Sequence, residues 1–147
     1  MFLNQQCVQS LNIRCTISIY EVIFYPMLES HLIAAEAADS KKSISIEIID
    51  LRGVTDMTDY FVIASGSSDR QVRAIADCIL DELKKAGESP LSKEGFDDAS
   101  WILLDYGDLV VHVFLEELRV HYDLGRLWKS AKKVEYANSN LVTSNQQ

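Results

Sequence analysis

The stretch "YFVIASGSSDRQVRAIADCILDELKK" (Tyr60–Lys85) decides the kind of fold that this chain can adopt. Its opening run, Tyr60–Ser65, is apolar or small throughout, which is typical of a central strand covered on both faces of a sheet. After a short turn, apolar residues recur at i, i+3, i+4, i+7, i+8 and i+11, a spacing that predicts one buried helix face. Gly87 follows two lysines and ends the predicted helix. The apolar positions are Val72, Ile75, Ala76, Ile79, Leu80 and Leu83.

The turn between this strand and this helix has two interpretations. A phosphate-binding Walker loop needs a lysine after its last glycine, and a Rossmann loop needs three glycines, whereas only Gly66 is present. Ser68 at the N-cap and Gln71 three residues later instead predict a capping box. A phosphate can bind at a helix N-terminus, but Asp69 already places negative charge there. A capped helix start is therefore favoured, and a nucleotide-binding loop at Gly66-Ser67 is the alternative.

The flanking segments alternate between strand and helix patterns. The run "SISIEIIDL" (43–51) alternates apolar and polar residues, as a half-buried strand does, and residues 27–42 carry a helical pattern. "WILLD" (101–105) and "LVVHVFL" (109–115) predict a hairpin around residues 106–108. Residues 89–95 hold a short strand, and residues 117–133 form a second amphipathic helix or a helical turn. We predict a single α/β domain with a mixed β-sheet and flanking helices.

Length and charge limit the function further. A chain of 147 residues corresponds to one domain, and we place that domain at residues 27–130. Residues 1–26 lack the features of a signal peptide and are interpreted as an N-terminal extension, disordered or upstream of the natural start. Residues 131–147 are interpreted as a flexible polar tail. A net charge of −8 does not favour binding to nucleic-acid phosphates, and it suits either a basic protein surface or simply a solvated, soluble surface. No apolar run is long enough for a transmembrane helix.

The acidic residues do not form a catalytic metal site in the sequence. Nucleotidyltransferases also begin with strand, Gly-Ser and helix, but they hold magnesium with Asp-x-Asp carboxylates on one strand face. Here Asp105 and Asp108 flank a turn, and Asp56 and Asp59 precede a strand. A spacing of three on an extended chain directs side chains to opposite faces. We therefore expect no metal, no cofactor and no enzymatic activity.

Three ring-bearing residues are candidates for a binding surface. His112 shares a strand face with Val110 and Phe114. It is either a satisfied core residue or a hydrogen-bond donor across an interface with a partner. Trp101 begins a strand and Trp128 ends the last predicted helix, so each is either a core residue or an interface hot spot.

Several separated blocks resemble one known family. The blocks "DYFVIASGSSDRQVRAIAD", "KEG" and "WILLDYGDLVVHVFLEELRVHYDLGRLW" are similar to the Iojap family, the ribosomal silencing factors. The resemblance runs from about Met27 to Trp128. It implies a nucleotidyltransferase-like fold without the catalytic acids, in a cytoplasmic bacterial protein or an organellar relative. It also implies translational repression: the factor binds ribosomal large-subunit protein 14 on the subunit-joining face and blocks the small subunit. Members are commonly dimeric when free.

The resemblance also implies roles for individual residues. Trp101 would be the apolar anchor on the partner, and Asp105 and Asp108 would pair with its lysines or arginines. His112 and Phe114 would fill the sheet face between them. Three residues match the closing motif of the family and would either contact the partner or pack on the sheet: Tyr122, Leu127 and Trp128.

One position departs from the family pattern. Gly125 stands where the closing motif usually carries an acid. A glycine inside a helix costs about 1 kcal/mol relative to alanine. We therefore expect the last helix to break at Gly125.

Overall fold

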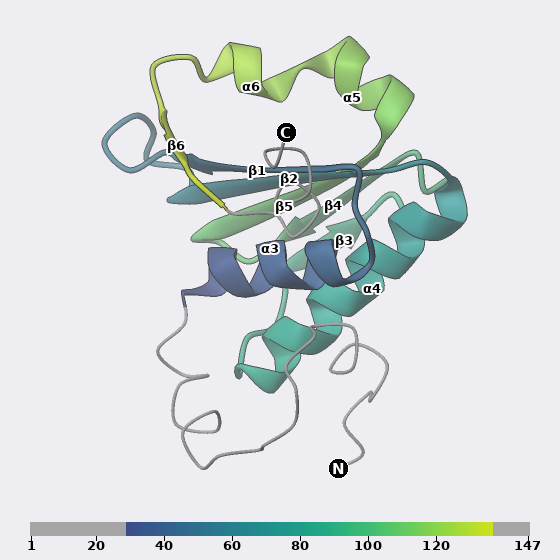
Figure 1. Cartoon of the computed structure of the whole chain (residues 1–147). Coiled ribbons are helices and arrows are strands. Elements are labelled where there is room, and N and C mark those ends of the chain that lie inside the picture. The colour runs from purple at the N-terminus through teal and green to yellow at the C-terminus, as the bar shows by residue number, and fades with distance from the viewer. Residues whose placement is uncertain (1–28, 137–147) are drawn as a thin grey trace, which may run out of the picture.

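A mixed six-stranded sheet lies between two layers of helices in the computed structural model, which describes residues 29–136 (Figure 1). Helices α3 and α4 cover one face of the sheet, and α5 and α6 lie over the other. In chain order the elements are α3 (Ser30–Ser40), β1 (Ser45–Asp50), β2 (Tyr60–Gly66), α4 (Asp69–Lys85), β3 (Ser92–Glu94), β4 (Trp101–Asp105), β5 (Leu109–Leu115), α5 (Glu116–Tyr122), α6 (Leu124–Leu127) and β6 (Lys132–Val134).

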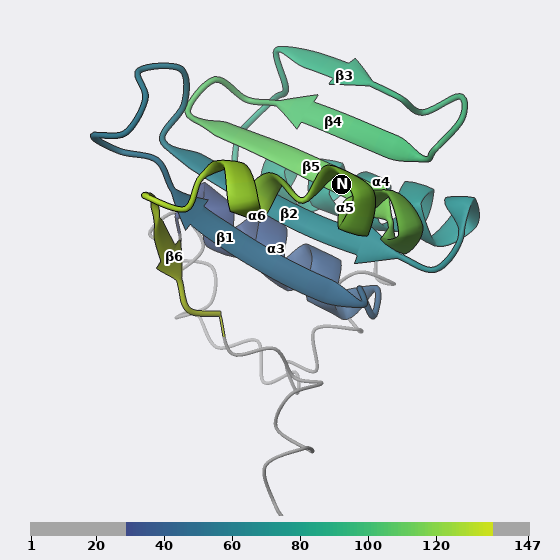
Figure 2. The same ribbon diagram turned by 90° about the horizontal axis from the view of Figure 1, so that it is seen from above.

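The strand order is β3-β4-β5-β2-β1-β6 (Figure 2). The central pair, β2 and β5, is parallel, and the other neighbouring pairs are antiparallel. A parallel pair needs a long crossover connection, and α4 with β3 and β4 provides it here. The predicted α/β class, mixed sheet and β4–β5 hairpin are confirmed.

Strand alternation divides the core into two halves. Residues on one side of the strands pack against α3 and α4, where α3 contributes four buried alanines that let it lie close to the sheet. Residues on the other side lie under α5 and α6. Strand β2 contributes to both halves, which confirms that it is a central strand covered on both faces. The buried members of the second half are Ile49, Leu51, Ile63 and Phe114.

The segment after β5 differs from the prediction. Instead of one amphipathic helix or turn over residues 117–133, the chain forms two short helices and then strand β6, which pairs antiparallel with β1. The break falls at Asp123, whose φ is +36°, and the expected break at Gly125 was wrong. Gly125 lies inside α6, where an added Cβ would come within 3.1 Å of both carboxylate oxygens of Glu47. The glycine therefore lets α6 approach β1 closely.

Strand β6 also corrects the expected domain boundary. It occupies residues 132–134, within the segment assigned to a flexible polar tail, and Tyr136 packs against the core. The sheet thus extends beyond residue 130, because the edge of β1 offers unpaired backbone groups to a returning chain. Residues 1–28 and 137–147, which include the predicted N-terminal extension and the end of the tail, lie outside the described residues.

Candidate functional site

Four of the predicted binding residues meet on the side of the sheet that faces α5. The β4–β5 register places Trp101 opposite Phe114, and Leu103 opposite His112. The Trp101 and Phe114 rings stack at 4.9 Å between centroids, and Tyr122 of α5 lies 5.2 Å from Trp101. His112 stacks along the strand on Phe114 at 6.1 Å. The sheet register thus assembles one cluster from two strands and a helix.

Phe61 of β2 extends this cluster, although it was not among the residues predicted from the sequence. Its ring stands edge-to-face with His112 at 4.9 Å and with Trp128 at 5.8 Å. Trp128 therefore reaches the cluster through Phe61. The two-residue period of a strand could have indicated Phe61, because it places Phe61 and Ile63 on one side of β2 and Val62 and Ala64 on the other. We refer to six side chains together as the aromatic face: Phe61, Trp101, His112, Phe114, Tyr122 and Trp128.

His112 is the buried polar centre of the aromatic face. Its exposed fraction is 5%, and the indole Nε1–H of Trp101 donates a hydrogen bond to its Nδ1 at 3.2 Å. Because Nδ1 accepts, the neutral ring carries its proton on Nε2. Burial lowers the pKa of His112 to about 4. Among residues 29–136, this Nε2–H has no hydrogen-bond acceptor, so His112 is buried but only half satisfied.

The lowered pKa predicts that acid destabilises the fold through His112. The unfolded chain binds a proton near its ordinary pKa of 6.5 and the folded chain only near 4, so stability falls as the pH drops through that window. We expect His112 to account for a loss of about 2 kcal/mol in the free energy of unfolding between pH 7.5 and 5. Urea unfolding of wild type and His112→Gln at both pH values measures how much of the loss in the free energy of unfolding is due to His112. The same loss in both proteins would contradict the assignment.

The two predicted acidic residues lie apart from the rings, at the turn of the hairpin. Asp105 accepts a hydrogen bond from the Gly107 N–H at 2.8 Å and so closes the turn. The exposed Asp108 accepts main-chain hydrogen bonds from the N–H groups of Asp59 and Tyr60 at 2.9 and 3.1 Å. Asp108 also lines a cleft of about 350 Å³. The two acids therefore lie at the far end of the hairpin strands from Trp101 and Phe114.

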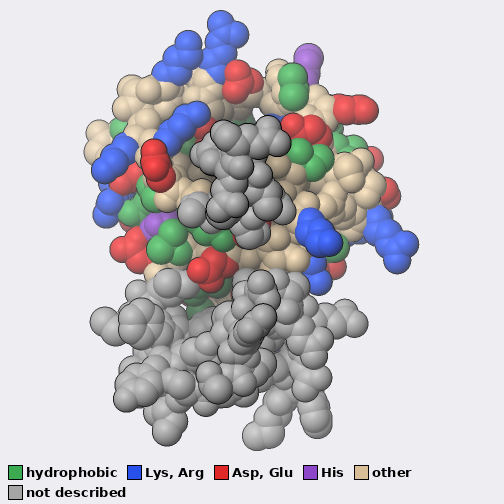
Figure 3. All heavy atoms as spheres, in the orientation of Figure 1, with side chains coloured by type: hydrophobic (Ala, Val, Ile, Leu, Met, Phe, Trp, Pro, Cys, Tyr) green, Lys and Arg blue, Asp and Glu red, His purple; other side chains and the backbone are tan. Residues whose placement is uncertain are grey.

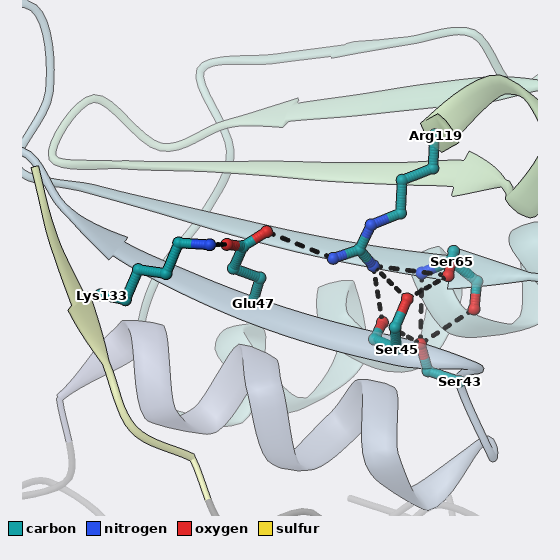
Figure 4. A network of polar contacts seen from close by, with 6 residues as sticks. All are labelled: Ser43, Ser45, Glu47, Ser65, Arg119 and Lys133. Atoms are coloured by element: carbon teal, nitrogen blue, oxygen red, sulfur yellow. Dashed lines mark hydrogen bonds and ion pairs between the residues drawn. The ribbon is translucent and has the colours of Figure 1, made fainter. Parts of the chain in front are cut away.

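Arg119 of α5 fastens the helical layer to the sheet (Figure 4). Its guanidinium donates to the Ser45 carbonyl at 3.1 Å and to the hydroxyls of Ser45 and Ser65. It also forms an ion pair with Glu47 at 3.4 Å, and Lys133 of β6 contacts the other carboxylate oxygen. Neither α5 nor α6 contains a fully buried residue, so this network attaches the layer together with the packing of the partly buried Leu118 and Leu124. Leu127 of α6 is 73% exposed and is absent from the buried clusters.

The Gly66-Ser67 turn, the alternative nucleotide loop, uses its polar groups within the protein. Ser68 Oγ accepts from the Gln71 N–H at 3.2 Å, as a capping residue does. The Gln71 side-chain oxygen accepts from Ser67 N–H at 2.7 Å and not from Ser68, so the expected capping box is only half formed. The Gln71 amide donates to the carbonyls of Lys41 and Lys42. Gln71 thus ties the start of α4 to the turn before β1.

Two other features are absent from the part of the chain that the structure describes. Between residues 29 and 136, no group of three or more His, Cys, Asp or Glu side chains is arranged to hold a metal ion. In the same range, no helix has the length and apolar character needed to cross a membrane.

The fold and the aromatic face define a single-domain α/β protein with an aromatic cluster on one side of its sheet and acidic residues at the distant hairpin turn. Residues 26–147 match the family described as "Ribosomal silencing factor during starvation". The chain is 46% identical over 99 residues to the ribosomal silencing factor RsfS of Bacillus subtilis, an alignment covering 67% of this chain and 84% of that protein. It is 34% identical over 104 residues to the chloroplastic protein Iojap of Zea mays, covering 69% of this chain and 44% of that one.

A solved structure is similar along the same region. A crystal structure of a Chromobacterium violaceum protein aligns with a TM-score of 0.65 and 35% identity, covering 75% of this chain and 93% of that one. This chain belongs to the RsfS family of ribosomal silencing factors. The resemblance seen in its sequence is thereby confirmed.

Proposed function

We propose that this chain represses translation by binding ribosomal large-subunit protein 14 on the subunit-joining face, where it blocks docking of the small subunit. Membership of the ribosomal silencing factor family supports the general activity. The aromatic face is the structural feature that identifies this side of the sheet as the proposed binding surface. In this proposal the protein acts in the cytoplasm by occupying the subunit-joining face, with no catalytic step and no cofactor.

The aromatic face has the composition of a binding hot spot. Trp101 is partly exposed, and its ring packs beside both the buried Phe114 and the 47% exposed Tyr122. Tryptophan and tyrosine in such settings carry much of the binding energy of protein interfaces. The Nε2–H of His112 adds a buried donor for which a partner can supply an acceptor after local adjustment of the rings.

The acidic residues at the hairpin turn favour a basic partner. Between Glu88 and Asp108 the chain carries six acidic residues and one basic residue, Lys93. Ribosomal proteins are basic, and complementary charge steers association and fixes orientation. Asp105 and Asp108 then contact lysines or arginines at the rim, while the rings supply the apolar centre.

We expect Asp108→Lys to weaken binding to isolated protein 14 about tenfold, because it places a like charge opposite a basic rim. Calorimetric titration at low salt measures the affinity, and the deficit should shrink as salt screens the charges. Asp77→Lys is the matched control, since it makes the same charge change at an exposed position of α4 on the opposite side of the sheet. Equal weakening by both variants would reject a specific role for Asp108.

The resemblance also predicts a homodimer when the protein is free. Sedimentation equilibrium of the purified chain gives its mass, and a mass equal to one chain at micromolar concentration would reject the dimer.

Binding of protein 14 by wild type is the first requirement of the proposal. A flat titration would remove it.

A further inference from the structure

Charge is distributed unevenly along this acidic chain. From Leu124 to Val134 the sequence contains four basic residues and no acidic one, although the whole chain has a net charge of −8. This segment comprises α6, the following turn and β6. Strand β6 forms one edge of the sheet, whereas the acidic region 88–108 includes β3 and β4 at the other edge. The two edges of the sheet therefore carry opposite charge.

The basic residues of this segment are available at the surface. We refer to these four exposed side chains as the basic patch: Arg126, Lys129, Lys132 and Lys133. Lysine and arginine side chains gather over α6 and β6 in the space-filling view (Figure 3).

The four members of the basic patch differ in what they contact. Lys133 pairs with Glu47. Hydrogen bonds from Arg52 lower the pKa of Asp50 to about 2, and the nearby Lys132 adds to this shift. Arg126 and Lys129 form no ion pair among residues 29–136, and together with Asp123 they line an open hollow of about 430 Å³ beside Leu127.

We propose that the basic patch contacts the phosphate backbone of ribosomal RNA while the aromatic face holds protein 14; this inference rests on the proposed function. A ribosomal surface presents two chemistries, basic protein and RNA phosphate. The sheet carries a complementary surface for each at its opposite edges. Phosphate contacts position a protein without reading sequence, so the patch orients the factor and adds no sequence specificity.

The basic patch can bind phosphate although the chain as a whole is acidic. A charge of −8 is an average over the chain, and a local set of unpaired cations can still release counterions from phosphates. RNA repels the acidic edge and attracts the basic edge, so the charge separation selects one orientation of docking.

The test compares two double variants with the same change in charge. Arg126→Glu/Lys129→Glu alters the basic patch, and Arg70→Glu/Lys84→Glu alters exposed positions of α4 on the other side of the sheet. Affinity for isolated large subunits is measured over a series of salt concentrations. We expect the patch variant to bind about tenfold more weakly at low salt, with a slope of log affinity against log salt shallower by about 1 to 2. The α4 variant should keep the wild-type slope.

A second titration separates this inference from the proposed function. Both variants should bind isolated protein 14 as wild type does, since that partner contains no RNA. Equal slopes for the two variants on large subunits would overturn the inference, and so would a loss of protein 14 binding confined to the patch variant. Failure of wild type to bind protein 14 would instead remove the proposed function.

Discussion

Replacing Trp101 by alanine is expected to weaken binding to the large ribosomal subunit by about a hundredfold, the size typical of a strong hot spot. The indole is stacked on Phe114, contacts Tyr122 and donates to His112. Its removal deletes the centre of the aromatic face and leaves Nδ1 of His112 without its donor. Affinity is measured by cosedimentation of the labelled protein with isolated large subunits.

Two further variants separate lost contact from lost folding. Phe96→Ala removes a partly buried ring that packs against the core half on the other side of the sheet, the half that contains α3 and α4. It should reduce stability while retaining binding at temperatures where the protein stays folded. Trp101→Phe keeps a ring but removes the N–H group, so we expect an intermediate affinity. Unchanged binding by Trp101→Ala, with folding verified by circular dichroism, would show that another surface contacts the subunit.

Replacing Arg119 by methionine is expected to lower the free energy of unfolding by about 3 kcal/mol. The guanidinium satisfies the carbonyl of Ser45 and pairs with Glu47, and the side chains of Arg119 and Glu47 are only 17% and 19% exposed. Without it, these acceptors remain under α5 with fewer donors. Urea unfolding followed by circular dichroism measures the change.

Lys133→Met provides the matched comparison for Arg119. It removes the other cation that contacts Glu47, but its side chain is 63% exposed. Pairs at such exposed positions contribute about 0 to 1 kcal/mol. Similar losses for the two variants would mean that Arg119 does not anchor the helical layer in the way its contacts indicate.

Local patterns in the sequence were sufficient for most of the fold. The alternation in 43–51 and the apolar run at Tyr60–Ser65 gave β1 and β2, and the spacing from Val72 to Leu83 gave α4. These elements were predictable because each buries a face whose period depends only on neighbouring residues. The same reasoning, together with the resemblance, gave Trp101 and His112 for the candidate site.

The features that were missed depend on contacts distant in sequence. Strand β6 is short and exposed, and it exists because β1 offers an edge for pairing. The helix break at Asp123, whose φ is +36°, lies between α5 and the chain segment that leads to that edge. Arg119 meets Ser45 and Glu47 from more than 70 positions away, as the sequence separations of 74 and 72 show. The spacing of apolar residues along a short segment does not show such contacts between distant residues.

The net charge of the chain does not show where its acidic and basic residues lie in the fold. The value of −8 left open a basic protein surface or simple solubility, and it did not favour nucleic acid. Only the sheet order showed that the acidic residues of 88–108 and the basic patch belong to opposite edges. Sequence likewise grouped Asp105 and Asp108 with the rings, whereas the hairpin separates them from the aromatic face.

The most direct measurement of the proposed repression is a subunit-joining assay. Large subunits are first saturated with the purified protein, small subunits are then added, and the mixture is separated by sedimentation. We predict that joined ribosomes decrease in proportion to the bound protein, which sediments with free large subunits only. Joined ribosomes that form at the normal level while still carrying the protein would contradict the proposed block of subunit association.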